Sequence, residues 1–317
     1  MDRGSAAAMN PTHGALPAVR LQGVVKRYGA RNVVDGVSLD IAQGEFFALL
    51  GANGAGKTTL ISMLSGLARP SAGSVQVLGH DVTREPYVTR RLLGVVPQEL
   101  VFDPFFTVRE ALRLQSGYFG LRRNDAWIDE LLQRLGLAQQ AGQNMRALSG
   151  GMKRRVMVAQ ALVHKPPVIV LDEPTAGVDV ELRQSLWQFI TDLNRQGHTV
   201  LLTTHYLEEA ESLCSRIGML KLGRLVALDA THALLARFAS TQLLLRASGQ
   251  PLPPALARRA RAVGARHAWT VRDAAEVERM LGELRAAGCE IEELEVRRAD
   301  LEDAFLHIMA GQAGAGA

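Results

Sequence analysis

Several features are scarce in this sequence of 317 residues, and each scarcity excludes a class of protein. The 2 cysteines, Cys214 and Cys289, lie far apart, which excludes a disulfide-rich secreted domain and favours buried, inert thiols in a reducing cytosol. No apolar run approaches the roughly 20 residues that a membrane-spanning helix needs, and residues 1–18 lack the apolar centre of a signal peptide. We therefore expect a cytoplasmic chain with no direct membrane span.

An excess of charge of one sign is also missing. The 36 Lys and Arg nearly balance the 32 Asp and Glu, so the formal net charge is only +4, and no nucleic acid partner is expected. We interpret the basic strings Lys153-Arg154-Arg155 and Arg258 to Arg266 as solvated helix faces. Hydrophobic residues make up 47% of the chain, which is enough for one large domain and a smaller one, each with its own core.

The most informative segment is GANGAGKTT, Gly51–Thr59, which fits the spacing G-x-x-x-x-G-K-[ST]. An apolar, strand-like run precedes it, and a helical apolar pattern runs from Leu60 to Leu67. In this order, backbone N–H groups and the positive end of the helix point into the loop, so a polyphosphate is the expected ligand. We expect Lys57 to reach the β- and γ-phosphates and Thr58 to bind Mg²⁺. The predicted nucleotide-binding residues of the loop are Gly51, Asn53, Gly54, Ala55, Gly56, Lys57, Thr58 and Thr59.

Two further segments carry chemistry. Val168–Glu173 is a short apolar strand that ends in two carboxylates, and ligands gather at the carboxyl ends of parallel strands. We expect Asp172 to hold Mg²⁺ and Glu173 to orient and deprotonate the attacking water, a role generally worth about 10²–10⁴-fold in rate. The string Leu148–Met152, LSGGM, opens a helix with a serine and two glycines, which offers bare N–H groups to an anion.

The order of these segments along the chain resembles that of the ATP-binding subunits of ABC transporters, over nearly all of residues 19–235. The family's signature is commonly LSGGQ, and Met152 replaces its final glutamine here. The resemblance implies that Tyr28 stacks on adenine and that His205 is the switch histidine of the catalytic set, with Glu173 and Lys57. The resemblance also gives further residues that would contact the nucleotide, namely Tyr28, Gln98, Ser149, Gly150, Gly151 and Asp179. The metal-binding residues that it implies are Thr58, Gln98 and Asp172.

Alternating helices and buried strands predict an α/β fold. It has a P-loop NTPase core of mostly parallel sheet, an antiparallel β flap and a helical insert, plus a small C-terminal α+β domain. We expect a disordered leader over 1–18, with Met9 as an alternative start, and an ATPase domain over 19–235 with its insert at about 99–150. A C-terminal accessory domain with a flexible tail is expected over 236–317, because Gly and Pro residues interrupt the patterns between 236 and 256.

The resemblance also implies partners. ABC ATPases enclose two nucleotides between two head-to-tail chains, so a homodimer is expected, and an integral membrane permease subunit would hold it at the inner face of the cell membrane. The tail Ala299–Leu306, ADLEDAFL, is similar to that of type-2 ABC exporter ATPases, the branch that moves drugs, polysaccharides and lipo-oligosaccharides. We expect the permease to dock in a groove at the insert lined by Phe102, Phe105 and Phe106.

Three alternative functions remain open at this level. One is a soluble ABC ATPase of DNA repair or translation, although the long coiled coils of the former and the two motif sets usual in the latter are absent here. The second is an importer ATPase, which shares every catalytic residue. The third is a non-enzymatic P-loop protein, against which Glu173 argues.

Overall fold

The computed structural model describes residues 16–175, 177–178, 180–237, 241–298 and 300–311. The chain divides into two compact units, residues 1–229 and 230–317, which are described separately below. The boundary predicted after residue 235 falls inside helix α8 (Thr231–Arg237). None of the helices in the described ranges combines the length and the apolar character that a bilayer crossing requires.

The first unit is built on a six-stranded sheet whose central strands β7 and β8 are mostly apolar and fully buried, as is typical of a sheet covered on both faces. The pairs β6·β7, β7·β8, β8·β3 and β3·β9 are parallel. Their carboxyl ends therefore lie at one edge of the sheet, where ligands of α/β proteins bind. In spatial order the strands are β10 (Arg224–Ala230), β9 (Arg216–Lys221), β3 (Phe46–Gly51), β8 (Thr199–Thr203), β7 (Val168–Asp172) and β6 (Leu93–Val96).

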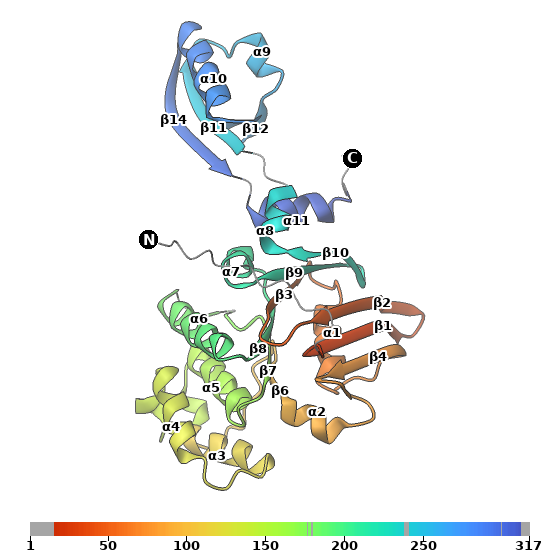
Figure 1. Cartoon of the computed structure of the whole chain (residues 1–317). Coiled ribbons are helices and arrows are strands. Elements are labelled where there is room, and N and C mark those ends of the chain that lie inside the picture. Colours follow the sequence, from red (N-terminus) through yellow and green to blue (C-terminus); the bar gives the residue numbers. More distant parts are fainter. Residues whose placement is uncertain (1–15, 176, 179, 238–240, 299, 312–317) are drawn as a thin grey trace, which may run out of the picture. The chain divides into compact units, whose positions relative to one another are not determined.

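A second, antiparallel sheet forms the predicted flap. Its strands, in spatial order, are β2 (Arg31–Ile41), β1 (Val19–Tyr28), β4 (Ala72–Val77) and β5 (His80–Asp81). Helix α1 (Lys57–Leu64) contacts strands of both sheets, and one buried apolar cluster contains side chains from α1 and from each sheet (Figure 1). The helix that begins at the glycine loop is thus clamped from two sides, which fixes the position of the loop itself.

Further helices cover the face of the six-stranded sheet that lies away from α1 and the antiparallel sheet. Figure 1 shows α5 and α6 beside this face. The predicted insert contains α3, whose Thr107 and Glu110 form the expected capping box, and α4, and both pack on α5. The helices of this unit are α1, α2 (Pro86–Leu92), α3 (Val108–Tyr118), α4 (Asp125–Arg134), α5 (Gly150–Leu162), α6 (Val180–Arg195) and α7 (Leu207–Leu213), with short 3-10 helices at Ala138–Gln140 and Met145–Ala147.

The second unit has its own four-stranded antiparallel sheet, in the spatial order β12-β13-β11-β14. The chain order βαββαβ with this arrangement is the split βαβ, or ferredoxin-like, topology. Its core includes Leu243, Trp269 and Leu284 from β11, β13 and α10. The elements are α8, β11 (Thr241–Gly249), α9 (Pro254–Ala257), β12 (Arg261–Val263), β13 (Arg266–Val271), α10 (Ala274–Ala286), β14 (Cys289–Arg298) and α11 (Leu301–Met309).

The structure corrects the expected helix and strand boundaries in two places. The segment 236–256 was expected to be interrupted, but β11 runs to Gly249, which ends the strand with a positive φ of 84°. The helical pattern expected to continue to Leu67 ends at Leu64, because Gly66 adopts a φ of 73° and turns the chain. Both cysteines are buried as predicted, and burial raises the pKa of the Cys214 thiol.

Candidate functional site

The glycine loop joins β3 to α1 in the predicted order of strand, loop and helix. Close backbone packing requires two of its glycines, since a Cβ on Gly51 would lie 2.5 Å from the carbonyl oxygen of Leu220, and one on Gly56 would lie 2.8 Å from that of Val33. Gly56 caps the helix with a φ of 109°, a conformation that other residues rarely adopt. The loop is thus a fixed turn that presents the N-terminus of α1.

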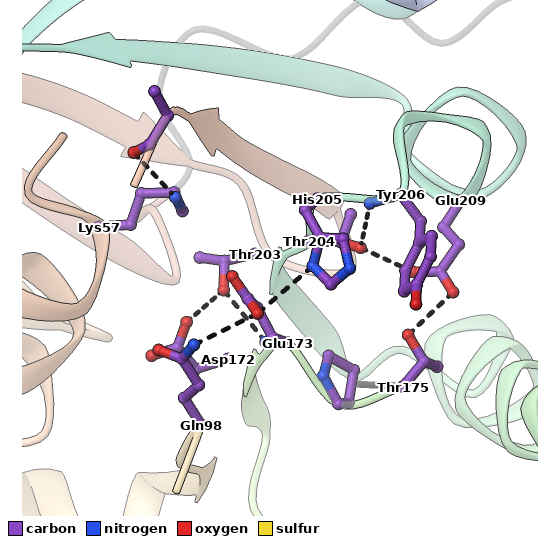
Figure 2. A network of polar contacts seen from close by, with 12 residues as sticks. Lys57, Gln98, Asp172, Glu173, Thr175, Thr203, Thr204, His205, Tyr206 and Glu209 are labelled. Atoms are coloured by element: carbon purple, nitrogen blue, oxygen red, sulfur yellow. Dashed lines mark hydrogen bonds and ion pairs between the residues drawn. The ribbon is translucent and has the colours of Figure 1, made fainter. Parts of the chain in front are cut away.

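Lys57 lies at the first position of α1 and is only 8% exposed. Its Nζ donates hydrogen bonds to the carbonyl oxygens of Gly51, at 2.7 Å, and Ala52, at 3.3 Å, so the side chain folds back along the loop (Figure 2). Burial lowers the pKa of the Lys57 ammonium, and the nearby carboxylates of Glu173 and Asp172 act in the opposite direction. A cation is therefore held in the loop beside two acidic groups.

The two carboxylates stand at the end of β7, in register with the end of β8, where Asp172 is paired with Thr203. Asp172 is 2% exposed, and its Oδ1 accepts a hydrogen bond from the Thr203 hydroxyl. Glu173 adopts a φ of 48°, which is unusual for a residue other than glycine, and its N–H donates to the Thr203 carbonyl at 3.0 Å. The turn at Glu173 directs the two carboxylates differently, although they are neighbours in the sequence.

Two predicted residues from other segments meet at Glu173. The Gln98 amide Nε2 donates to Glu173 Oε2 at 3.3 Å, and His205 Nδ1 lies 3.3 Å from the same oxygen (Figure 2). Gln98 follows β6, and His205 follows β8. The strand order of the sheet therefore brings together three side chains that are far apart in the sequence, at the edge where the glycine loop also lies.

The remaining predicted residues are placed as follows. Tyr28 ends β1, is 53% exposed, and has Lys26 Nζ 4.9 Å from its ring centroid. Ser149 caps α5, and its hydroxyl accepts a hydrogen bond from the N–H of Met152 at 3.3 Å. A Cβ on Gly150 or Gly151 would meet nothing within 4 Å, so this turn is open to an approaching group. Asp179 lies outside the described residues.

Sequence reasoning missed a buried carboxylate behind the site. Glu209 of α7 accepts hydrogen bonds from the Thr175 hydroxyl at 2.9 Å and from the Thr204 hydroxyl at 2.8 Å (Figure 2). It also accepts one from Trp187 Nε1 at 3.0 Å. It thereby links the segments that follow Glu173 and precede His205. Its position in an acidic, helical stretch gives no sign of burial, so no sequence signal could have identified it.

Interpretation of the string Lys153-Arg154-Arg155 as a solvated face was wrong for its two arginines. Arg154 and Arg155 are 3% and 6% exposed. Arg155 Nη1 donates to the carbonyl oxygens of Leu135 and Gly136, at 2.7 and 3.2 Å. Each guanidinium is buried because it can satisfy several backbone carbonyls at once, an arrangement that depends on tertiary contacts.

The predicted apolar groove at the insert is present, but other residues line it. A cavity of about 700 Å³ lies between α2, α3, α5 and the end of β6, and its lining includes Leu67, Tyr87, Val101, Tyr118, Arg90 and Arg91. Phe102, Phe105 and Phe106 are not among the lining residues. Phe105 is exposed, with the Arg146 guanidinium 6.0 Å from its ring centroid. A groove therefore lies beside the insert, but the three phenylalanines that were expected to line it do not.

The donor set fits a nucleotide with a magnesium ion. The first intrahelical bond of α1 runs from the N–H of Leu60 to the carbonyl of Gly56, so the amides of Lys57, Thr58 and Thr59 are available to phosphate oxygens. In the described part of the chain no three His, Cys, Asp or Glu side chains form a metal cluster. Mg²⁺ typically uses one or two protein oxygens together with phosphates and water, which the Thr58 hydroxyl and the Asp172 carboxylate can supply.

This fold and site define the chain as a P-loop ATPase. The family profile described as "ABC transporter" matches residues 34–176. The Nod factor export ATP-binding protein I of Paraburkholderia xenovorans (strain LB400) is 45% identical over 221 residues, which cover 69% of this chain and 73% of that protein. The daunorubicin resistance ATP-binding protein DrrA3 of Streptomyces coeruleorubidus is 39% identical over 306 residues, covering 92% and 95%.

Solved structures agree with the sequence relatives. The dimeric structure of a bacterial ABC transporter cassette matches with a TM-score of 0.62 and 28% identity, over 67% of this chain and 98% of that one. The chain belongs to the ATP-binding subunits of ABC transporters, and it is an ATP-hydrolysing transport ATPase. The predicted family and α/β fold class are confirmed, and the comparisons do not favour a repair, translation or importer ATPase.

Proposed function

We propose that this chain is the ATPase subunit of an ABC exporter and works as a homodimer beside a separate membrane permease, at the inner face of the cell membrane. The observation that carries the proposal is the similarity to the daunorubicin resistance ATP-binding protein, because it extends over 92% of this chain and therefore includes the second unit. The relatives named for Nod factor export support the same direction of transport.

The glycine loop and its lysine bind the triphosphate in this proposal. Lys57 exchanges its two loop carbonyls for β- and γ-phosphate oxygens, and the amides at the start of α1 bind the others. Tyr28, exposed at the end of β1, stacks on the adenine. Bound Mg²⁺, held by Thr58 and Asp172 with Gln98 nearby, would neutralise charge on the phosphates. The Thr203 hydroxyl fixes the Asp172 carboxylate, since it donates to one of its oxygens.

Glu173 serves as the general base. Gln98 and His205 both contact Oε2 of its carboxylate, at 3.3 Å each, so we assign the other oxygen, Oε1, to the attacking water. The water loses its proton to Glu173 as its oxygen attacks the γ-phosphorus, and ADP leaves. His205 and Gln98 orient the base, which contributes to rate because a positioned reactant needs no further ordering.

The dimer completes each site from the second copy. The Ser149–Gly151 turn presents the amides of a helix N-terminus with open space around both glycines, and such a terminus attracts a γ-phosphate. Asp179 is proposed to lie at the dimer interface. A crystal structure of the chain with a non-hydrolysable ATP analogue tests this arrangement, because the Gly150 and Gly151 amides must then contact the γ-phosphate bound by the other protomer.

The permease is proposed to dock in the groove between α2, α3 and α5. Exposed apolar side chains, Leu67, Tyr87 and Tyr118, line it, and Arg90 and Arg91 add positive charge. A short amphipathic helix with an acidic residue on its polar side matches this lining, because its apolar face would cover the exposed rings and its carboxylate would pair with an arginine.

Glu173→Gln tests the catalytic proposal. We expect the turnover of Mg-ATP to fall by about 10²–10⁴-fold, because the amide cannot accept the water's proton, while ATP binding is retained. The variant should accumulate as an ATP-bound dimer in size-exclusion chromatography. Glu208→Gln, at an exposed position three residues beyond His205, is the matched control and should keep wild-type turnover. Unchanged turnover in Glu173→Gln would exclude Glu173 as the base.

Tyr87→Ala tests the docking proposal. Tyr87 is 82% exposed and lines the groove, so its loss should reduce copurification with membranes while ATP hydrolysis by the isolated chain stays unchanged. Phe105→Ala is the matched control, since Phe105 is similarly exposed but lies outside the lining. If Phe105→Ala loses copurification and Tyr87→Ala does not, the permease does not dock in the groove.

A further inference from the structure

Arg154 is buried next to the site but has no role in the functions assigned above. It lies in the second turn of α5, the helix that Ser149 caps, and its side chain is 3% exposed. Removing a guanidinium from water is costly, so a chain that buries one must satisfy its donors well. The contacts of Arg154 are therefore informative about what the residue does.

The guanidinium donates to five backbone carbonyls in two segments. Nη1 donates to Pro97 at 2.6 Å and to Gln98 at 2.9 Å, just beyond the end of β6. At the end of β7, the other two nitrogens bond three consecutive carbonyls: Nη2 donates to Glu173 at 2.6 Å and to Asp172 at 3.5 Å, and Nε donates to Pro174 at 3.3 Å. The planar, multidentate guanidinium thus holds the two segments at a fixed separation.

Both segments carry side chains that meet at the catalytic carboxylate. Gln98 donates to Glu173 Oε2, and Arg154 binds the backbone carbonyls of both residues. Glu173 has the left-handed φ of 48°, a conformation that costs of order 1–3 kcal/mol and persists only where its surroundings enforce it. The Thr203 carbonyl holds the N–H of Glu173, and Arg154 holds its carbonyl, so the strained residue is fixed on both sides.

We propose that Arg154 is a positioning residue for ATP hydrolysis, which ties the backbones of Gln98 and Glu173 to the helix that carries the Ser149–Gly151 turn. This inference rests on the proposed role of Glu173 as the base. Arg154 acts only through other residues and leaves ATP binding to the glycine loop. Lysine cannot replace it, because an ammonium group offers three donors from one atom and cannot span both segments.

The experiment compares Arg154→Lys with Arg155→Lys in the purified full-length chain. Arg155 is the matched control, because it is the next residue of α5, is similarly buried, and donates to carbonyls of the insert. Steady-state hydrolysis at varied Mg-ATP gives kcat and KM, and thermal unfolding gives Tm. We expect Arg154→Lys to lower kcat by about 10–100-fold with KM within about twofold, since small misplacements of a reacting group cost up to about 10²-fold.

Arg155→Lys should lower Tm by an amount similar to Arg154→Lys but keep kcat within about twofold of wild type. Equal kcat losses in the two variants, or a kcat for Arg154→Lys that matches wild type, would overturn the inference and leave Arg154 a structural residue. Glu173→Gln, assayed in parallel, separates the two proposals. If Glu173→Gln keeps its turnover, the proposed base is wrong; if it loses turnover while Arg154→Lys does not, only the positioning role is wrong.

Discussion

The two units of the chain differ in where charged side chains gather. Near the strand ends of the first unit, Lys57, Arg154 and Asp172 are 8%, 3% and 2% exposed. On the sheet of the second unit, Arg246 and Arg266 pair with glutamates of β14, and these side chains are 39–52% exposed. Burying a charge has a large desolvation cost, whereas exposed ion pairs cost and contribute little.

This difference in burial indicates that the charged side chains of the first unit serve the site, whereas those on the sheet of the second unit lie on its surface. In the proposed mechanism, the first unit accepts the cost of buried charges because they would position phosphates, a metal and a base. The second unit has an apolar core around Trp269, and among its described residues one charged side chain, Glu276, is buried, at 6% exposed. Four further experiments would break or sharpen this comparison.

The largest effect is expected from the core of the second unit. Trp269 is 1% exposed, and its Nε1 donates to the carbonyl of Leu256 at 2.9 Å. Trp269→Ala should cost about 3–5 kcal/mol in the stability of this unit, measured by urea unfolding with limited proteolysis to locate the change. The KM for ATP should stay within about twofold. A large rise in that KM would contradict the separation of stability and function between the units.

In the first unit, Lys57→Met should weaken ATP binding and leave stability almost unchanged. Removing the charge should weaken ATP binding by about 10–150-fold, the equivalent of about 1.5–3 kcal/mol for a hydrogen bond to a charged group. The free energy of unfolding without nucleotide should change by less than about 1 kcal/mol, because the loss of a desolvated cation offsets the loss of its hydrogen bonds. Calorimetric titration and urea unfolding measure the two quantities. If the variant is strongly destabilised yet binds ATP normally, Lys57 contributes to stability and not to ATP binding.

The pH dependence of the first unit gives a third test. His164 stacks on Phe119 at a centroid distance of 3.7 Å and lies 3.0 Å from the Leu93 carbonyl, and burial lowers its pKa from 6.5 to about 4. The His164 side chain of the unfolded chain therefore binds a proton more readily than that of the folded chain. The contribution of neutral His164 to the free energy of unfolding should be complete above about pH 6.5 and should be lost as the pH falls towards about 4. His164→Gln should flatten this dependence in urea unfolding. Parallel pH profiles for variant and wild type would assign the acid sensitivity to another group.

The smallest effect is expected from the exposed ion pairs of the second unit. Arg246 lies 2.8 Å from Glu293, and both side chains are well exposed. A double-mutant cycle with Arg246→Gln and Glu293→Gln should give a coupling energy below about 1 kcal/mol, which high salt reduces further. A coupling above about 2 kcal/mol would show that the charged surface of this sheet stabilises the unit, and the contrast with the first unit would then be weaker.

Much of the site could be predicted from the sequence because phosphate chemistry restricts both residue type and spacing. The loop Gly51–Thr59, the strand that ends at Asp172 and the capped turn at Ser149 all occur in the predicted elements. Arg154 and Glu209 could not be predicted, since a buried arginine or glutamate in a helix has the same local pattern as a solvated one. Strand β11 was missed because the Gly and Pro residues that follow it masked the short apolar run.

The sequence by itself determined the chemistry that this chain can offer: which groups can hold phosphate, which oxygens can bind a metal, and which carboxylate can act as a base. These properties depend on residue type and on spacings of a few residues along one strand, loop or helix. Only the tertiary structure decided that Gln98 and His205 meet at one oxygen of Glu173 and that Arg154 holds two strand ends together. The order and register of strands distant in sequence set those contacts, and burial then determines which charges are solvated.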